Sequence, residues 1–284
     1  MADKNPFPGE KNTGHIWDDV IRELTNPPPR WWMIGFIASF IFFIGYGVLY
    51  PAWPGITGYT KGILGWTSIK EYKEDAAEID AIRSKYEKQL PGMSAKEILA
   101  NTDLTNYSKA SAKATFGDRC APCHGKGGQG NPEFPVLADD DWLYGGTPEK
   151  IEESITRGRK GMMTAHGANL SEQEIDTLAN YVNDLSQGKG DSNGKSMFLQ
   201  KGCIGCHGMD AKGVEIMGAA DLTDVIWRFV PGGVESARYT IAHGVNDPND
   251  PKTRNAEMPS FKDHLSETEI RKLTVYVHQL GGGQ

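Results

Sequence analysis

Cysteine is scarce in this chain of 284 residues, which contains only four. They form two closely spaced pairs, so no thiol remains for a disulfide framework or for a separate nucleophile. An excess of positive charge is also absent. The formal net charge is −7, which excludes the electrostatics expected of a nucleic-acid-binding protein. Only one stretch, close to the N-terminus, is both long and free of charged residues.

Each cysteine pair is followed directly by a histidine. The two motifs are Cys120-Ala-Pro-Cys123-His124 and Cys203-Ile-Gly-Cys206-His207. This spacing is typical of covalent haem attachment, in which the thiols add to the haem vinyl groups and the imidazole binds the iron. A CxxC pair alone also fits a zinc half-site or a redox pair. A four-cysteine zinc site leaves the repeated histidine unexplained, so the motifs predict two covalently attached haem c groups.

The uncharged stretch runs from Trp31 to Tyr50. At about 1.5 Å per residue in a helix, its length matches a bilayer core of about 30 Å. Trp and Tyr residues flank it, as they do at membrane interfaces. Pro51 and Pro54 follow it instead of a small-residue cleavage site, so we expect a permanent anchor over 31–53 rather than a signal peptide.

Residues 1–30 precede the anchor as a polar segment that is rich in proline. Apolar side chains recur at helical spacing from Ile16 to Leu24, and Thr13 is a suitable N-cap. The pattern predicts a short amphipathic helix that lies on a membrane surface or on a partner subunit.

The remainder of the chain contains an internal repeat. The segment 155–158 resembles 241–244, and 170–175 resembles 265–270, in step with the two cysteine motifs. The second copy carries a polar insertion over 245–257. We therefore expect a linker over 54–105, with a charged helix from about residue 70 to 88, and then two domains over 106–188 and 189–284.

Both copies end in a similar amphipathic helix. Ser171 with Glu174, and Ser266 with Glu269, have the spacing of a capping box. Each helix has an apolar stripe, and we expect each stripe to pack against the haem-bearing N-terminal helix of its own domain. The two stripes are Ile175, Leu178, Tyr181, Val182 and Leu185, and Ile270, Leu273, Tyr276, Val277 and Leu280.

The segments around the anchor resemble one protein family closely. The motifs at 14–18, 26–32, 51–54 and 64–68 are similar in order and spacing to those of the dihaem cytochrome subunit of cbb3-type cytochrome c oxidase. The resemblance continues through both haem domains. It implies a mainly α fold, with one N-terminal transmembrane helix followed by two tandem class I cytochrome c domains. It also implies a bacterial inner-membrane protein with a cytoplasmic N-terminus and periplasmic haem domains.

The same resemblance implies the sixth ligand of each iron. Met258-Pro259 is similar to the Met-Pro loop of class I cytochromes c, whereas Met163 is followed by Thr164 where the family usually has proline. Met162 and His166 remain alternatives to Met163. Whether each methionine binds the haem of its own domain or of the other stays open.

Partners of the proximal histidines and of the haem propionates are also implied. Pro135 resembles the proline whose carbonyl accepts the histidine N–H, and Ala220 stands at the corresponding place in the second copy. The candidates for pairing with propionates are Arg157, Arg159, Arg228 and Arg238.

The function implied is electron transfer without substrate chemistry in this chain. Electrons would pass from a soluble cytochrome c through the two haems to a monohaem cytochrome subunit, and then to the haem-copper subunit that reduces oxygen. A dihaem peroxidase and a dihaem cytochrome of another respiratory complex are the alternatives. Prompt CO binding at one ferrous haem favours the peroxidase, and co-purification with a haem-copper subunit distinguishes the respiratory complexes.

Overall fold

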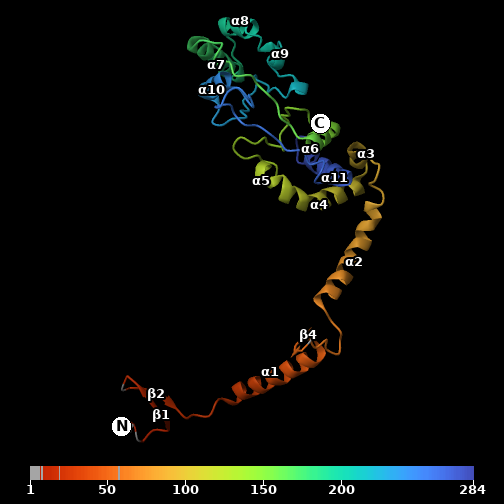
Figure 1. Ribbon diagram of the computed structural model, residues 1–284, viewed down its shortest axis with the longest axis vertical. Coiled ribbons are helices and arrows are strands. Elements are labelled where there is room, and N and C mark those ends of the chain that lie inside the picture. Colours follow the sequence, from red (N-terminus) through yellow and green to blue (C-terminus); the bar gives the residue numbers. More distant parts are fainter. Residues whose placement is uncertain (1–6, 8, 19, 57) are drawn as a thin grey trace. The chain divides into compact units, whose positions relative to one another are not determined.

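The computed structural model describes residues 7, 9–18, 20–56 and 58–284. It divides into two compact units, Met1–Arg83 and Ser84–Gln284. Nearly all of the regular structure is helical (Figure 1).

The segment before the anchor is a β-hairpin, so the prediction of an amphipathic helix there is wrong. Strands β1 (Asn12–Trp17) and β2 (Ile21–Leu24) pair antiparallel, with Trp17 opposite Ile21. Gly14 and Asp18 both have positive φ, at 83° and 49°, which a helix does not allow. The apolar residues whose spacing suggested a helix lie on the two paired strands instead.

Helix α1 (Arg30–Leu49) is the predicted anchor, and it is long and apolar enough to cross a membrane. The chain turns back at its end through the short strands β3 (Pro54–Gly55) and β4 (Gly58–Tyr59). Backbone N–H groups of Ile63 and Leu64 then donate to the last carbonyls of α1, at 3.0 and 3.1 Å. This return satisfies carbonyl groups that a helix end otherwise leaves unpaired.

The charged segment forms helix α2 (Ser68–Glu87), as the sequence predicts. Within the second unit, the first haem motif is carried by α4 (Thr102–Arg119) and the turn α5 (Ala121–His124), and the second by α8 (Ser192–Gln200) and α9 (Ile204–His207). The other elements of this unit are α3 (Ala95–Leu99), α6 (Pro148–Arg157), α7 (Glu172–Ser186), the 3-10 turn η1 (Glu215–Met217), α10 (Gly233–His243) and α11 (Glu267–His278).

Among the described residues this unit has three apolar cores, and the two that adjoin the cysteine motifs each take a helix from the other half of the sequence. Helix α11 packs against α4 and α6, where Leu273 and Ile270 meet Phe116. Helix α7 packs against α8 and α10, where Leu178 meets Phe198. Figure 1 shows both groupings. We refer to them as the α4–α6–α11 core and the α7–α8–α10 core.

The expectation that each final helix packs within its own domain is therefore wrong. The two apolar stripes are nearly interchangeable, so the sequence pattern does not distinguish one groove from the other. The connections decide instead. Only residues 187–191 separate α7 from α8, and short connections between helices favour antiparallel neighbours. Gly194 allows the close approach, because a Cβ there would overlap Tyr181 of α7.

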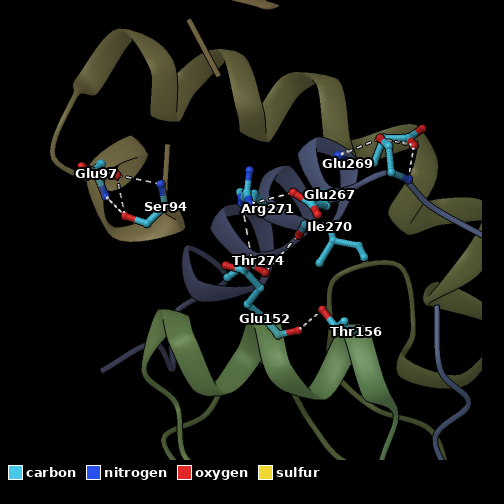
Figure 2. A network of polar contacts seen from close by, with 10 residues as sticks. Ser94, Glu97, Glu152, Thr156, Glu267, Glu269, Ile270, Arg271 and Thr274 are labelled. Atoms are coloured by element: carbon cyan, nitrogen blue, oxygen red, sulfur yellow. Dashed lines mark hydrogen bonds and ion pairs between the residues drawn. The ribbon is translucent and has the colours of Figure 1, made fainter. Parts of the chain in front are cut away.

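The start of each final helix is as predicted. Both capping boxes form, with each serine hydroxyl accepting from the backbone N–H of the glutamate and the glutamate accepting from the backbone N–H of the serine. In Figure 2, α11 lies among the helices of its core, with Glu269 at its start and Arg271 directed toward Glu152 of α6. The Arg271–Glu152 ion pair measures 3.5 Å. Polar contacts thus also join α11 to the half of the sequence that precedes it.

Candidate haem sites

The first cysteine motif stands where α4 turns sharply into α5. Cys120 closes α4 through a 2.9 Å bond from its N–H to the Phe116 carbonyl, and His124 ends the following turn. His124 Nδ1 lies 3.0 Å from the Pro135 carbonyl oxygen. A carbonyl can only accept, so Nδ1 carries the proton and Nε2 keeps its lone pair. The predicted role of Pro135 is confirmed, and the imidazole is set up as a metal ligand.

The second motif repeats this arrangement at the end of α8. His207 Nδ1 lies 3.1 Å from the carbonyl oxygen of Ala220, so the prediction for Ala220 is also confirmed. Two thiols and one imidazole with a free Nε2 are the donor set that covalent haem attachment requires. The residues at both motifs therefore fit the cofactor.

Burial favours the neutral form of one cysteine and of the histidine in each motif, as the directions of their pKa shifts show. It raises the pKa of Cys120 to about 11 and also raises the pKa of Cys203. Burial lowers the pKa of His124 and of His207, against the opposing effect of the carbonyl bond. An uncharged imidazole is the form that binds a metal ion.

A cavity of about 540 Å³ adjoins the second motif. Its wall includes Cys203, Cys206 and His207, and it is largely apolar where α7, α8 and α10 contribute Leu178, Phe198 and other side chains. Met163 lies in the same wall. A volume of this size with a few polar groups is typical of a cofactor site.

The methionine loops cross between the two halves. Met163 exchanges two backbone hydrogen bonds of 2.9 Å with Val245, just after α10. Met258 exchanges bonds of 2.8 and 2.9 Å with Arg159, just after α6. Met258 consequently packs on the α4–α6–α11 core together with Cys120, and Met163 packs on the α7–α8–α10 core together with Cys203.

Two glycines allow this crossing. Gly158 and Gly244 close α6 and α10 with φ of 71° and 66°, conformations that strongly favour glycine. A Cβ on Gly244 would overlap the carbonyl oxygen of Met163, and one on Gly158 would overlap that of Met258. The internal repeat aligns Gly158 with Gly244, but the sequence does not indicate that both glycines allow a methionine loop to approach closely.

The two alternatives to Met163 as an iron ligand, Met162 and His166, lie at the same cavity. Met162 borders the same cavity but its residue is 62% exposed, whereas Met163 is partly buried against the core. His166 also borders the cavity, and its backbone N–H donates to Ile241.

The four predicted propionate partners separate into two pairs. Arg157 and Arg238 form ion pairs with carboxylates on helix surfaces, and neither borders the cavity. Arg159 and Arg228 border it. Arg159 is already bonded to Glu153 and Ser154, and Arg228 to Asp141.

The fold and the two sites define a membrane-associated cytochrome with two c-type haem domains in tandem. Three family models match the chain: the N-terminal domain of cytochrome oxidase-cbb3, FixP, over residues 9–57; cytochrome c oxidase, cbb3-type, subunit III, over 108–182; and cytochrome c over 192–281.

Curated relatives match along almost the whole chain. The FixP subunit of the cbb3-type cytochrome c oxidase of Azorhizobium caulinodans is 40% identical, over 97% of this chain and 94% of its own. That of Bradyrhizobium diazoefficiens is 38% identical over the full length of both chains. The CcoP subunit of Cereibacter sphaeroides is 36% identical over 98% of this chain and 97% of its own. The chain belongs to the FixP/CcoP family of cbb3-type cytochrome c oxidase subunits.

This assignment confirms the resemblance read from the anchor-flanking motifs. It also confirms the mainly helical fold with two cytochrome c domains, the two covalently bound haem c groups, and electron transfer as the function of the subunit. As an oxidase subunit, the chain associates with the other subunits of its complex.

Proposed function

We propose that each haem is bound by residues from both halves of the sequence. The haem on Cys120 and Cys123 would have His124 and Met258 as axial ligands. The haem on Cys203, Cys206 and His207 would have Met163. The observation that supports this most directly is the presence of Met163 in the wall of the His207 cavity, while Met258 packs beside Cys120.

Axial closure on both faces suits a relay of electrons rather than catalysis in this chain. Haem iron supplies one-electron redox chemistry, and a histidine–methionine pair raises its potential. The protein holds the two imidazoles through their carbonyl bonds and presents the two thioethers from crossed loops. If His124 and Met258 hold one haem iron and His207 and Met163 the other, neither iron would keep a free position for peroxide or oxygen.

The electron route that we infer begins at a soluble cytochrome c, passes through the two haems and reaches the monohaem cytochrome subunit. From there, electrons would enter the haem-copper subunit, where oxygen is reduced. The relatives are subunits of cbb3-type cytochrome c oxidases, which supports this placement. Co-purification of a haem-copper subunit with the detergent-solubilised chain tests it.

The membrane topology that we infer has residues 1–30 in the cytoplasm, the anchor over 31–53, the linker over 54–105 and both haem segments in the periplasm. Support comes from α1 and from the periplasmic attachment of c-type haem in bacteria. The segments 106–188 and 189–284 remain the two haem-attachment domains in this proposal, each completed by the final helix of the other. A protease-protection assay on spheroplasts, with tags at both ends, tests the orientation.

Single-haem variants of the full-length chain test the crossed ligation. In a chain with Cys203→Ser and Cys206→Ser, only the first motif carries haem. There we expect Met258→Ala to abolish the weak far-red band of methionine-ligated ferric haem, and Met163→Ala to leave the band intact. The opposite pattern would mean that each methionine serves its own half.

The unmodified chain provides the test against a peroxidase. Two haem-stained, six-coordinate centres that do not bind CO in the ferrous state are expected. Prompt CO binding at one centre of the unmodified protein would favour the enzyme instead.

A further inference from the structure

Arg254 lies in the insertion 245–257 that distinguishes the second haem domain from the first. Its guanidinium carbon is 4.4 Å from the ring centroid of Phe229 and 4.8 Å from that of Tyr239, so the group lies between two aromatic rings. Nη2 donates to Ser236 Oγ at 3.3 Å. Nε is buried and has no hydrogen-bond partner in the part of the chain that the structure describes.

An unpaired buried donor on a charged group is unfavourable and is rare in folded proteins. Neighbouring groups hold the Arg254 backbone and one of the two flanking rings. Its backbone N–H donates to Gly244 at 3.2 Å and its carbonyl accepts from Asn246 at 2.8 Å. The Tyr239 hydroxyl is itself held by the Lys252 carbonyl at 2.8 Å. The guanidinium thus lies between two rings on a hydrogen-bonded backbone, and its buried Nε–H has no partner among the described residues, which indicates a missing acceptor.

The position of Arg254 identifies that acceptor. Phe229 and Ser236, which contact the guanidinium, both border the cavity that contains His207 and Met163. Among the described residues, no Asp or Glu side chain lies within 4 Å of the Arg254 side-chain nitrogens. A haem bound in this cavity brings carboxylates of its own, its propionates. We propose that the free Nε–H of Arg254 donates to a propionate of the haem attached at Cys203 and Cys206.

This function separates Arg254 from the Lys and Arg side chains that line the cavity. Arg228, Arg159 and Lys201 already have protein carboxylates as partners, at 2.6, 3.2 and 2.5 Å. Among the described residues, no carboxylate within 4 Å offsets the positive charge of Arg254. Such a charge near the porphyrin favours the reduced iron, because reduction removes one positive charge from the metal. The insertion would therefore raise the potential of the second haem above that of the same site without it.

A redox titration of the full-length, detergent-solubilised chain tests the proposal, which rests on the proposed assignment of the second haem site. In Arg254→Gln, we expect the reduced-to-oxidised ratio of the second haem at fixed ambient potential to fall about tenfold, equivalent to a shift of about 59 mV for one electron. The first haem should keep its potential. The component that shifts in Met163→His identifies the second haem.

Two further variants separate charge from packing. Arg238→Gln is the control that removes a different cation, on α10. Arg238 already pairs with Glu172 and Asp176, so neither haem potential should change. Arg254→Lys keeps the charge but loses the planar group, so the potential should fall less than in Arg254→Gln. In the redox-difference infrared spectrum, the propionate C–O band should shift in both Arg254 variants and not in Arg238→Gln.

The outcomes are distinct. Reduced thermal stability of Arg254→Gln with both potentials and the propionate band unchanged would overturn the proposal and leave Arg254 a packing residue. If the unmodified chain shows no haem stain or no far-red band, the assignment of the haem site is overturned instead. If Arg254→Gln does not fold, Arg254→Lys decides, because an unchanged propionate band there also overturns the proposal.

Discussion

Replacing Gly244 by alanine tests the crossing of the methionine loops. Two effects add at this position. The backbone at Gly244 has φ of 66° and ψ of −169°, a region that is essentially restricted to glycine, so an L-residue there costs about 1–3 kcal/mol. The new Cβ would also overlap the Met163 carbonyl oxygen, which is backbone and cannot rotate away.

The second effect bears directly on the proposed ligand. To relieve the overlap, the backbone at Met163 must move away from Val245. This movement breaks the two hydrogen bonds between them, which contribute about 0.5–1.5 kcal/mol each. The total loss in the free energy of unfolding is then about 2–6 kcal/mol. Movement of Met163 should also weaken its bond to iron, so the far-red band of the second haem should decrease.

Gly188→Ala is the matched control. Gly188 has a φ of 68°, but no atom lies within 4 Å of a Cβ built on it. It should therefore show the conformational penalty alone, about 1–2 kcal/mol, with an unchanged far-red band. Denaturant unfolding of both haem-loaded variants, followed with the far-red spectrum, measures both quantities. Equal losses in Gly244→Ala and Gly188→Ala, with both bands intact, would refute the close approach of the loops.

Two other predictions concern contacts between the halves. The Glu174 pKa is lowered to about 2, mainly by its bond to Lys201, so this pair should stabilise the fold above pH 4.5 and lose its effect as the pH falls toward 2. The stability difference between the unmodified chain and Glu174→Gln should therefore shrink over that range in acid unfolding curves, and a constant difference would contradict the assignment. Arg228 and Asp141 are each about 15% exposed and pair at 2.6 Å, while burial raises the pKa of Asp141 against the opposing charge of Arg228. Arg228→Met should destabilise by roughly 1–3 kcal/mol, since it leaves a partly buried carboxylate without its partner. Adding Asp141→Leu should restore part of that loss, and a double variant less stable than the single one would contradict this.

Local features of this chain were predictable from sequence because each is determined by a few neighbouring residues. The CxxCH motifs, the anchor α1 and both capping boxes belong to this group. The proximal carbonyl acceptors were also predictable, from the resemblance of the loop at Pro135 and its counterpart at Ala220.

The non-local features were not predictable in the same way. The stripes of α7 and α11 are so alike that periodicity cannot assign either one to a groove, and the assignment depends on the short connection between α7 and α8. The hairpin before α1 was missed because apolar residues in two paired strands can reproduce a helical spacing. Arg254 resembles any surface arginine in the sequence, and only its burial between two rings distinguishes it.

The exchange of helices and loops has a consequence for electron transfer between the haems. If each half closed its own site, the halves could rotate about a linker and the distance between the irons would vary. Here α11 and Met258 pack on the core that Cys120 adjoins, and α7 and Met163 pack on the core that Cys203 adjoins. Separating the halves would therefore remove the final helix and the proposed methionine ligand of each haem. An intact pair of sites requires both halves to be docked, so the fold itself keeps the two proposed redox centres at a fixed separation.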